Sequence, residues 1–112
     1  MPIEKWSDRI VIAHLAADPH LSEDFQSAQE EGAQEGIDVI LDFAAVKYLN
    51  SSHIARLLKL RKVITTAGNR LVLCCVDTQV WGAFLVTGLD KVFEFTDSVP
   101  TALASVQLSR QP

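Results

Sequence analysis

The sequence lacks any run of five charged residues of one sign, and it carries fewer basic than acidic side chains. Lys and Arg total 10 against 14 Asp and Glu, which gives a formal net charge of −4 at pH 7. Proteins that bind nucleic acid or an anionic membrane surface concentrate Lys and Arg in a patch or stripe. We therefore expect neither kind of partner for this chain.

Long hydrophobic stretches are also missing. A helix that spans a bilayer needs roughly 18–20 consecutive apolar residues, and the apolar runs here are far shorter. Residues 1–6 include two charged side chains, and the apolar run at residues 10–13 ends at His14, which is not the pattern of a secretion signal. These features predict a cytoplasmic protein without membrane insertion.

Cysteine and histidine are scarce. The two cysteines, Cys74 and Cys75, are neighbours, and neighbouring residues of a strand point to opposite faces, so we expect two buried thiols and no disulfide. Free buried thiols fit a reducing compartment. The three histidines, His14, His20 and His53, stand at no usual ligand spacing from a cysteine or from one another, so no metal site and no cofactor are predicted.

Glycine is too sparse and scattered for a phosphate-binding loop. The segment 32–36 begins and ends with glycine but lacks the Lys-Ser or Lys-Thr ending that such a loop needs. Ser52 and His53 lack the glycines of a nucleophile elbow, and neighbours on a helix point about 100° apart, so His53 is poorly placed as a base. Asp38 and Asp42 fit capping or solvated positions of a strand better than a catalytic pair. The sequence therefore predicts a protein that is not an enzyme.

What the sequence does have is a regular alternation of apolar patterns. Hydrophobic residues make up 48% of its 112 residues, enough for one core and too few for two, so residues 1–112 are expected to form a single domain. The expected elements are strands 3–6 and 9–16, helix 22–36, strand 37–43, helix 51–67, strand 70–76, helix 78–87, strand 91–95 and helix 99–108. This order predicts an α/β fold with about four helices and a mixed, mostly parallel sheet of about five strands, with the strongly apolar strand 37–43 at its centre.

The start of the helix at residue 51 carries two adjacent hydroxyl groups. Asn50 or Ser51 is expected to cap the helix by accepting a hydrogen bond from its first turn. The free N–H groups of that turn and the positive end of the helix dipole also favour an anion. A phosphate on Ser51 would be well placed, and the alternative is that residues 50–52 form only a cap.

Four short segments follow one another at a particular spacing. A strand ends in Leu-Asp-Phe, a helix starts with Asn-Ser-Ser-His, a strand opens with Gly-Asn-Arg-Leu-Val-Leu, and a helix closes in Thr-Gly-Leu; these are residues 41–43, 50–53, 68–73 and 87–89. In this order the chain resembles the STAS domain family over residues 37–104. The best-known members of that family are bacterial anti-sigma factor antagonists.

The resemblance implies a regulatory protein-binding module without catalysis of its own. In the antagonist branch of the family the unphosphorylated domain binds an anti-sigma factor that is also a serine kinase, which releases the sigma factor. The kinase phosphorylates the position that corresponds to Ser51 here, and a serine phosphatase reverses the reaction. By this resemblance the chain is a bacterial phosphoprotein of transcription regulation, and its predicted partner-binding residues are Asn50, Ser51, Ser52, His53 and Arg56.

The chain departs from the family motif at three places. Asn50 stands where the motif has Asp, and His53 replaces its Gly, which would put a ring where a partner approaches. Residues 17–20 replace the Gly-x-Leu-Asp element that follows the second strand in the family. These departures leave an alternative function open: a scaffold subunit of a multi-protein STAS signalling assembly or of a lipid-transport complex, in which Ser51 and Ser52 serve as cap and contact surface.

Overall fold

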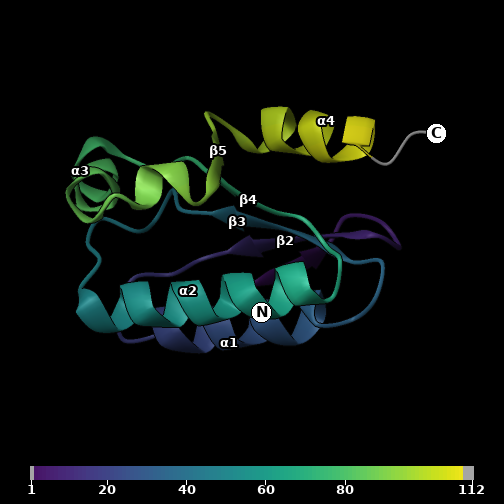
Figure 1. Ribbon diagram of the computed structural model, residues 1–112, viewed down its shortest axis with the longest axis horizontal. Helices are drawn as coiled ribbons and strands as arrows, with labels where there is room; N and C mark the ends of the chain where they lie inside the picture. The colour runs from purple at the N-terminus through teal and green to yellow at the C-terminus, as the bar shows by residue number, and fades with distance from the viewer. Residues whose placement is uncertain (1, 110–112) are drawn as a thin grey trace.

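The computed structural model describes residues 2–109, which form a five-stranded sheet with helices on both faces (Figure 1). The elements in chain order are β1 (Ile3–Lys5), β2 (Ile10–His14), α1 (Leu21–Gly32), β3 (Asp38–Asp42), α2 (Ser51–Thr66), β4 (Leu71–Cys74), α3 (Thr78–Thr87), the 3-10 helix η1 (Leu89–Lys91), β5 (Glu94–Thr96) and α4 (Val99–Ser109). The strands lie in the order β1-β2-β3-β4-β5, and only β1 is antiparallel to its neighbour. The predicted α/β fold with a mixed sheet and β3 at its centre is confirmed.

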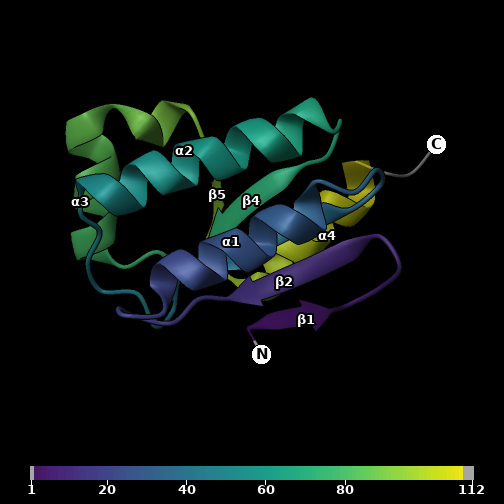
Figure 2. The same ribbon diagram turned by 90° about the horizontal axis from the view of Figure 1, so that it is seen from below.

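The sheet is covered on both faces. Helices α1 and α2 lie side by side against one face, and α4 lies against the other, as the two views show (Figures 1 and 2). Along β3, Val39 and Leu41 belong to the larger core on the side of α1 and α2, whereas Ile40 belongs to a smaller core with residues of α4. Burial on both faces explains why the central strands are mainly apolar. None of the helices in the described part of the chain is long and apolar enough to cross a bilayer.

Helix α1 is shorter than predicted. It ends at Gly32 rather than near residue 36, because the buried side chain of Asn69 holds the turn that follows. The Asn69 Nδ2 group donates to the carbonyl oxygens of Gly32 at 2.9 Å and of Gln34 at 2.6 Å. The end of α1 is therefore set by a residue that lies beyond the end of α2, which local pattern does not reveal.

Strand β5 begins at Glu94 rather than at residue 91 as predicted. Gly88 ends α3 in the left-handed conformation, with φ +74°, and the chain then makes the 3-10 helix η1 before the strand. Phe93 follows η1 and is buried in the larger core. The apolar residues at 92 and 93 that suggested a strand thus belong to a turn, in which Phe93 packs inward and Val92 is exposed.

Gly32 lies in close contact with α2 and β3. A Cβ atom at this position would lie 2.8 Å from Cδ1 of Ile64 and 2.9 Å from Cγ2 of Val39. Both neighbours are fully buried, so neither side chain has free space to move into. We expect Gly32→Ala to lower the free energy of unfolding by about 1–3 kcal/mol in chemical denaturation, because overpacking forces the core to shift.

Gly82 provides a matched control for that substitution. It lies inside α3, and a Cβ atom there would meet no atom within 4 Å. Gly82→Ala is therefore expected to raise the free energy of unfolding by about 0.5–1 kcal/mol through helix propensity. A Gly32→Ala variant as stable as the Gly82→Ala variant would contradict the close packing of α1 on α2.

Candidate functional site

The helix α2 begins with a reciprocal cap. Asn50 precedes the helix in an extended conformation, and its Oδ1 atom accepts a hydrogen bond from the N–H of His53 at 2.9 Å. In return the N–H of Asn50 donates to Nδ1 of His53 at 3.1 Å. This is the arrangement of a capping box, with an imidazole in the place of the usual Glu or Gln. The cap expected at Asn50 or Ser51 is thus made by Asn50.

The second nitrogen of His53 ties the cap to a distant loop. Nε2 lies 2.9 Å from Oδ1 of Asp18, in the connection between β2 and α1. Because Nδ1 accepts from the backbone, the ring proton is assigned to Nε2, which donates to the Asp18 carboxylate. The ring of Tyr48 meets His53 edge-on, with centroids 6.4 Å apart.

The expectation that the His53 ring projects toward a partner is wrong. The residue is only 4% exposed, since its ring is occupied by the cap and by Asp18. His53 can therefore affect partner binding only by positioning the start of α2. Its role could not be found from spacing, because Asp18 lies 35 residues earlier in the chain.

Ser51 and Ser52 present their side chains to solvent at the first turn of α2. No acidic residue occupies that turn. The first N–H groups of a helix have no acceptor within the helix, and they carry its positive partial charge. The structure thus places two exposed hydroxyl groups where an added anion would be stabilised.

Arg56 turns from this surface toward the neighbouring helix. Its guanidinium donates a hydrogen bond to Oε1 of Gln26 in α1, and the residue is half-buried. The Arg56 Nε atom is buried and has no hydrogen-bond partner within residues 2–109. Arg56 therefore stands one turn behind the two serines and packs on α1, and its contact with a partner stays a prediction.

A second polar group lies at the carboxyl ends of β2 and β3. Nδ1 of His14 is 2.8 Å from Oδ2 of Asp42, and Nε2 is 2.8 Å from Oε1 of Glu4. The hydrogen bonds to Glu4 and then Asp42 raise the pKa of His14. Burial opposes ionisation of Asp42, but hydrogen bonds from the Ala44 N–H and from His14 lower its pKa overall.

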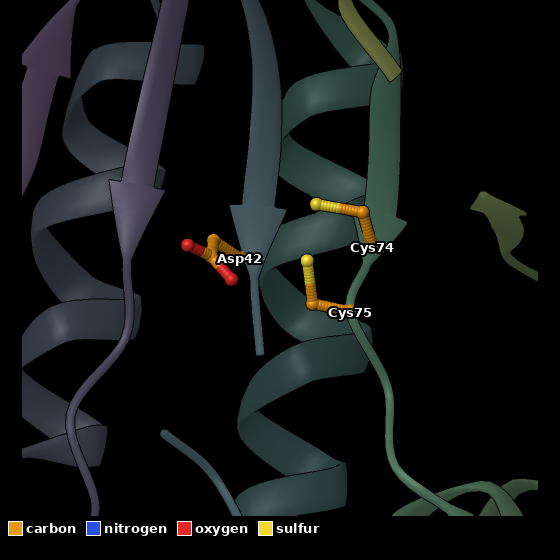
Figure 3. Close-up of side chains that lie close together, drawn as sticks. All are labelled: Asp42, Cys74 and Cys75. Atoms are coloured by element: carbon orange, nitrogen blue, oxygen red, sulfur yellow. The ribbon is translucent and has the colours of Figure 1, made fainter. Parts of the chain in front are cut away.

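The two cysteines lie beside Asp42 rather than on opposite faces (Figure 3). Strand β4 ends at Cys74, and Cys75 leaves the extended conformation with φ +60°, in the left-handed region that residues other than glycine seldom adopt. Both are free thiols, and burial raises the pKa of each. The alternation rule failed because it holds only within a strand. The sequence signal that could have found this group is a Cys-Cys pair at the end of one strand together with an Asp at the end of the neighbouring strand.

Asp38 has a structural role. It is buried, and its Oδ1 atom accepts a hydrogen bond from the N–H of Arg70 at 2.8 Å, where β3 and β4 begin. The side chains of Asp38 and Asp42 belong to opposite ends of β3. The interpretation that they are not a catalytic pair agrees with this separation.

The comparisons with known proteins concern almost the whole chain. A family model for the STAS domain matches residues 8–102, and no curated protein matches the sequence. An anti-sigma-factor antagonist (STAS) domain protein from Planctomyces limnophilus has a similar fold, with a TM-score of 0.78, 18% identity and coverage of 94% of this chain and 97% of that one. The unphosphorylated anti-sigma factor antagonist SpoIIAA gives a TM-score of 0.70 and 14% identity over 97% of each chain. A chain of the stressosome, a signal integration and transduction hub, gives a TM-score of 0.72 and 19% identity, with coverage of 98% of this chain and 100% of that one.

Proposed function

Because this chain belongs to the STAS domain family, we propose that it is a regulatory protein-binding module of the cytoplasm that is switched by phosphorylation of Ser51. In its unphosphorylated state it binds an anti-sigma factor that is also a serine kinase, and a serine phosphatase restores it. It has no catalytic activity of its own. The observation that carries the proposal is an exposed Ser51 hydroxyl at the first residue of a helix that Asn50 already caps.

The start of α2 can accept a phosphate without a change of fold. A phosphoserine carries between one and two negative charges and three strong acceptor oxygens. The first-turn N–H groups and the helix dipole favour such a group, and no acidic residue of that turn opposes it. The capping bond of Asn50 uses the N–H of His53, so it does not compete for the N–H groups of residues 51 and 52.

The surface around Ser51 suits a protein partner. Ser51, Ala55 and Leu58 are spaced four and three residues apart on α2, so they share one side of the helix. Leu58 is 39% exposed, and Tyr48, just before the helix, is 65% exposed. A partner that covers this side would bury apolar atoms together with the Ser51 hydroxyl. A phosphate at Ser51 would then lose its hydration within the interface, and binding would weaken.

Phosphorylation is tested by intact mass after incubation with ATP and the cognate kinase, and on protein isolated from its native cells. We expect a gain of one phosphate that maps to Ser51, is absent in Ser51→Ala and is retained in Ser52→Ala. Ser51 and Ser52 are neighbours and both are exposed, so Ser52→Ala is the matched control. A phosphate that persists in Ser51→Ala, or none in the wild type, would refute the switch at this residue.

A scaffold subunit is the second candidate function. The contacts of His53 with Asn50 and Asp18 fix the start of α2, where the family motif has a Gly. Such a rigid surface suits constant association in a multi-protein STAS assembly or a lipid-transport complex. A chain that binds its partner but takes up no phosphate would support this second function over the switch.

A further inference from the structure

The strongest unassigned group of side chains lies at the carboxyl edge of the sheet. Asp42, Cys74 and Cys75 each offer one ligand atom, a carboxylate oxygen and two sulfurs, and these atoms all lie within 4.8 Å of one another. Figure 3 shows the two sulfurs close to each other at the end of β4, with that of Cys74 directed toward the side of Asp42. The group plays no part in the proposed switch at Ser51.

The topology of the sheet produces this grouping. Asp42 and Cys74 are paired residues of the parallel strands β3 and β4, so their side chains lie side by side. Cys75 joins them because its left-handed conformation turns the chain at the end of β4. A non-glycine residue with this φ is held against an energetic preference of about 1–2 kcal/mol, and here the turn brings the second thiol to the first.

We propose that Asp42, Cys74 and Cys75 form a binding site for one thiophilic divalent cation of the Zn²⁺ type. Two thiolates and one carboxylate are ligands that Zn²⁺ prefers, and a fourth position open to water completes a tetrahedron. Sulfurs bound to one zinc at about 2.3 Å stand about 3.8 Å apart. The observed grouping within 4.8 Å is thus close to the bound geometry and needs only small side-chain movements.

The surroundings of Asp42 favour a fixed ligand. One carboxylate oxygen, Oδ2, is held by His14, whose other nitrogen is held by Glu4. Partners of this kind orient a coordinating carboxylate and are worth about 10- to 100-fold in metal affinity. Cys74 is fully buried, but Cys75 is half-buried and the Asp42 side chain is 13% exposed, so an ion can enter from that side.

Binding exchanges protons for the ion. Each cysteine enters as a neutral thiol, its S–H bond breaks, and a sulfur–metal bond forms, so two protons pass to the buffer for each cation bound. No oxidation is involved, and the two sulfurs stay unbonded to each other.

The test is a titration of the chelator-treated, phosphine-reduced chain with Co²⁺ in the absence of oxygen. We expect sulfur-to-cobalt charge-transfer absorption that saturates at one Co²⁺ per chain and is abolished by an equivalent of Zn²⁺. Proton release, read in weak buffer, is expected to reach two per ion. A folded, reduced wild-type chain that shows no charge-transfer absorption would overturn the proposal.

Three variants assign the ligands. Cys75→Ser is expected to lose at least half of the charge-transfer absorption. It should also bind Zn²⁺ more than about 100-fold more weakly, since removing a ligand costs more affinity than removing a residue that only hydrogen-bonds to a ligand. Asp42→Asn should also weaken the binding of Zn²⁺. His14→Ala should lower the Zn²⁺ affinity about 10- to 100-fold and keep the sulfur-to-cobalt charge-transfer absorption. Circular dichroism of each metal-free variant checks that it is folded.

Asp97→Asn is the matched control for the carboxylate, because Asp97 is an exposed acid that follows β5 at the same edge of the sheet. It should bind both ions as the wild type does. Equal Zn²⁺ affinity in Asp42→Asn and Asp97→Asn, or full absorption in Cys75→Ser, would contradict the assigned site.

Discussion

Replacing His53 by alanine is expected to lower the free energy of unfolding by about 2–4 kcal/mol. The change removes the acceptor of the Asn50 N–H, which is half of a cap worth about 0.5–2 kcal/mol. It also removes the donor to the Asp18 carboxylate, and hydrogen bonds to charged groups contribute about 1.5–3 kcal/mol. The ring is 4% exposed, so its loss leaves a cavity as well. Chemical denaturation followed by circular dichroism measures the effect.

His20 supplies the control for the loss of an imidazole. Its side chain is 65% exposed and, within residues 2–109, its one ion pair is with Glu23 at 3.8 Å, so His20→Ala should change stability by less than about 0.5 kcal/mol. The stability of His53→Gln should lie between those of the wild type and His53→Ala, because a Gln side chain at this position of a capping box can accept the hydrogen bond from the N-cap N–H. If His53→Ala were no less stable than His20→Ala, the reciprocal cap would have no energetic role.

The sequence was informative where a pattern is local. The apolar run at residues 37–43 predicted a strand covered on both faces, and β3 is the centre of the sheet. The apolar pattern of residues 51–67 predicted a helix, and α2 runs from Ser51 to Thr66 with Leu57, Leu60 and Ile64 fully buried. Asn50 was a cap candidate because its residue type is favoured there, and it does cap α2.

The sequence was misleading where a contact joins distant segments or a strand ends. The inward turn of His53 depends on Asp18, which belongs to a different loop and stands at no characteristic spacing. The approach of Cys75 to Asp42 depends on β4 ending at Cys74, and strand ends are not fixed by alternation of apolar residues. Neither the contact of His53 with Asp18 nor that of Cys75 with Asp42 can be predicted until the arrangement of the strands in the sheet is known.

The second large effect concerns the partner and rests on the proposed function. Ser51→Asp is expected to weaken binding of the cognate anti-sigma kinase by about 10- to 100-fold, or about 1.4–2.8 kcal/mol. The reason is that a carboxylate at this exposed position would be desolvated against the partner together with Leu58 and Tyr48. Isothermal titration calorimetry with the purified kinase domain, without ATP, gives the dissociation constants.

Because Asn50 caps α2, Ser51→Ala can be compared directly with Ser51→Asp. Had Ser51 been the capping residue, Ser51→Ala would have damaged the helix; since Asn50 accepts the bond, Ser51→Ala should keep both stability and partner binding. Ser22→Asp places the same charge in the first turn of α1, at an exposed position, and should leave binding unchanged. Both variants place a carboxylate near a helix N-terminus, where the dipole interaction is worth about 0.3–1 kcal/mol, but the first turn of α1 already carries Glu23 and Asp24 whereas that of α2 has no acid. Ser51→Asp is thus the less perturbing of the two for its helix, so a loss of affinity in Ser51→Asp alone reports the interface rather than the fold. Equal affinity in Ser51→Ala and Ser51→Asp would mean that charge at this position does not control binding, and the scaffold function would then account better for the surface of α2.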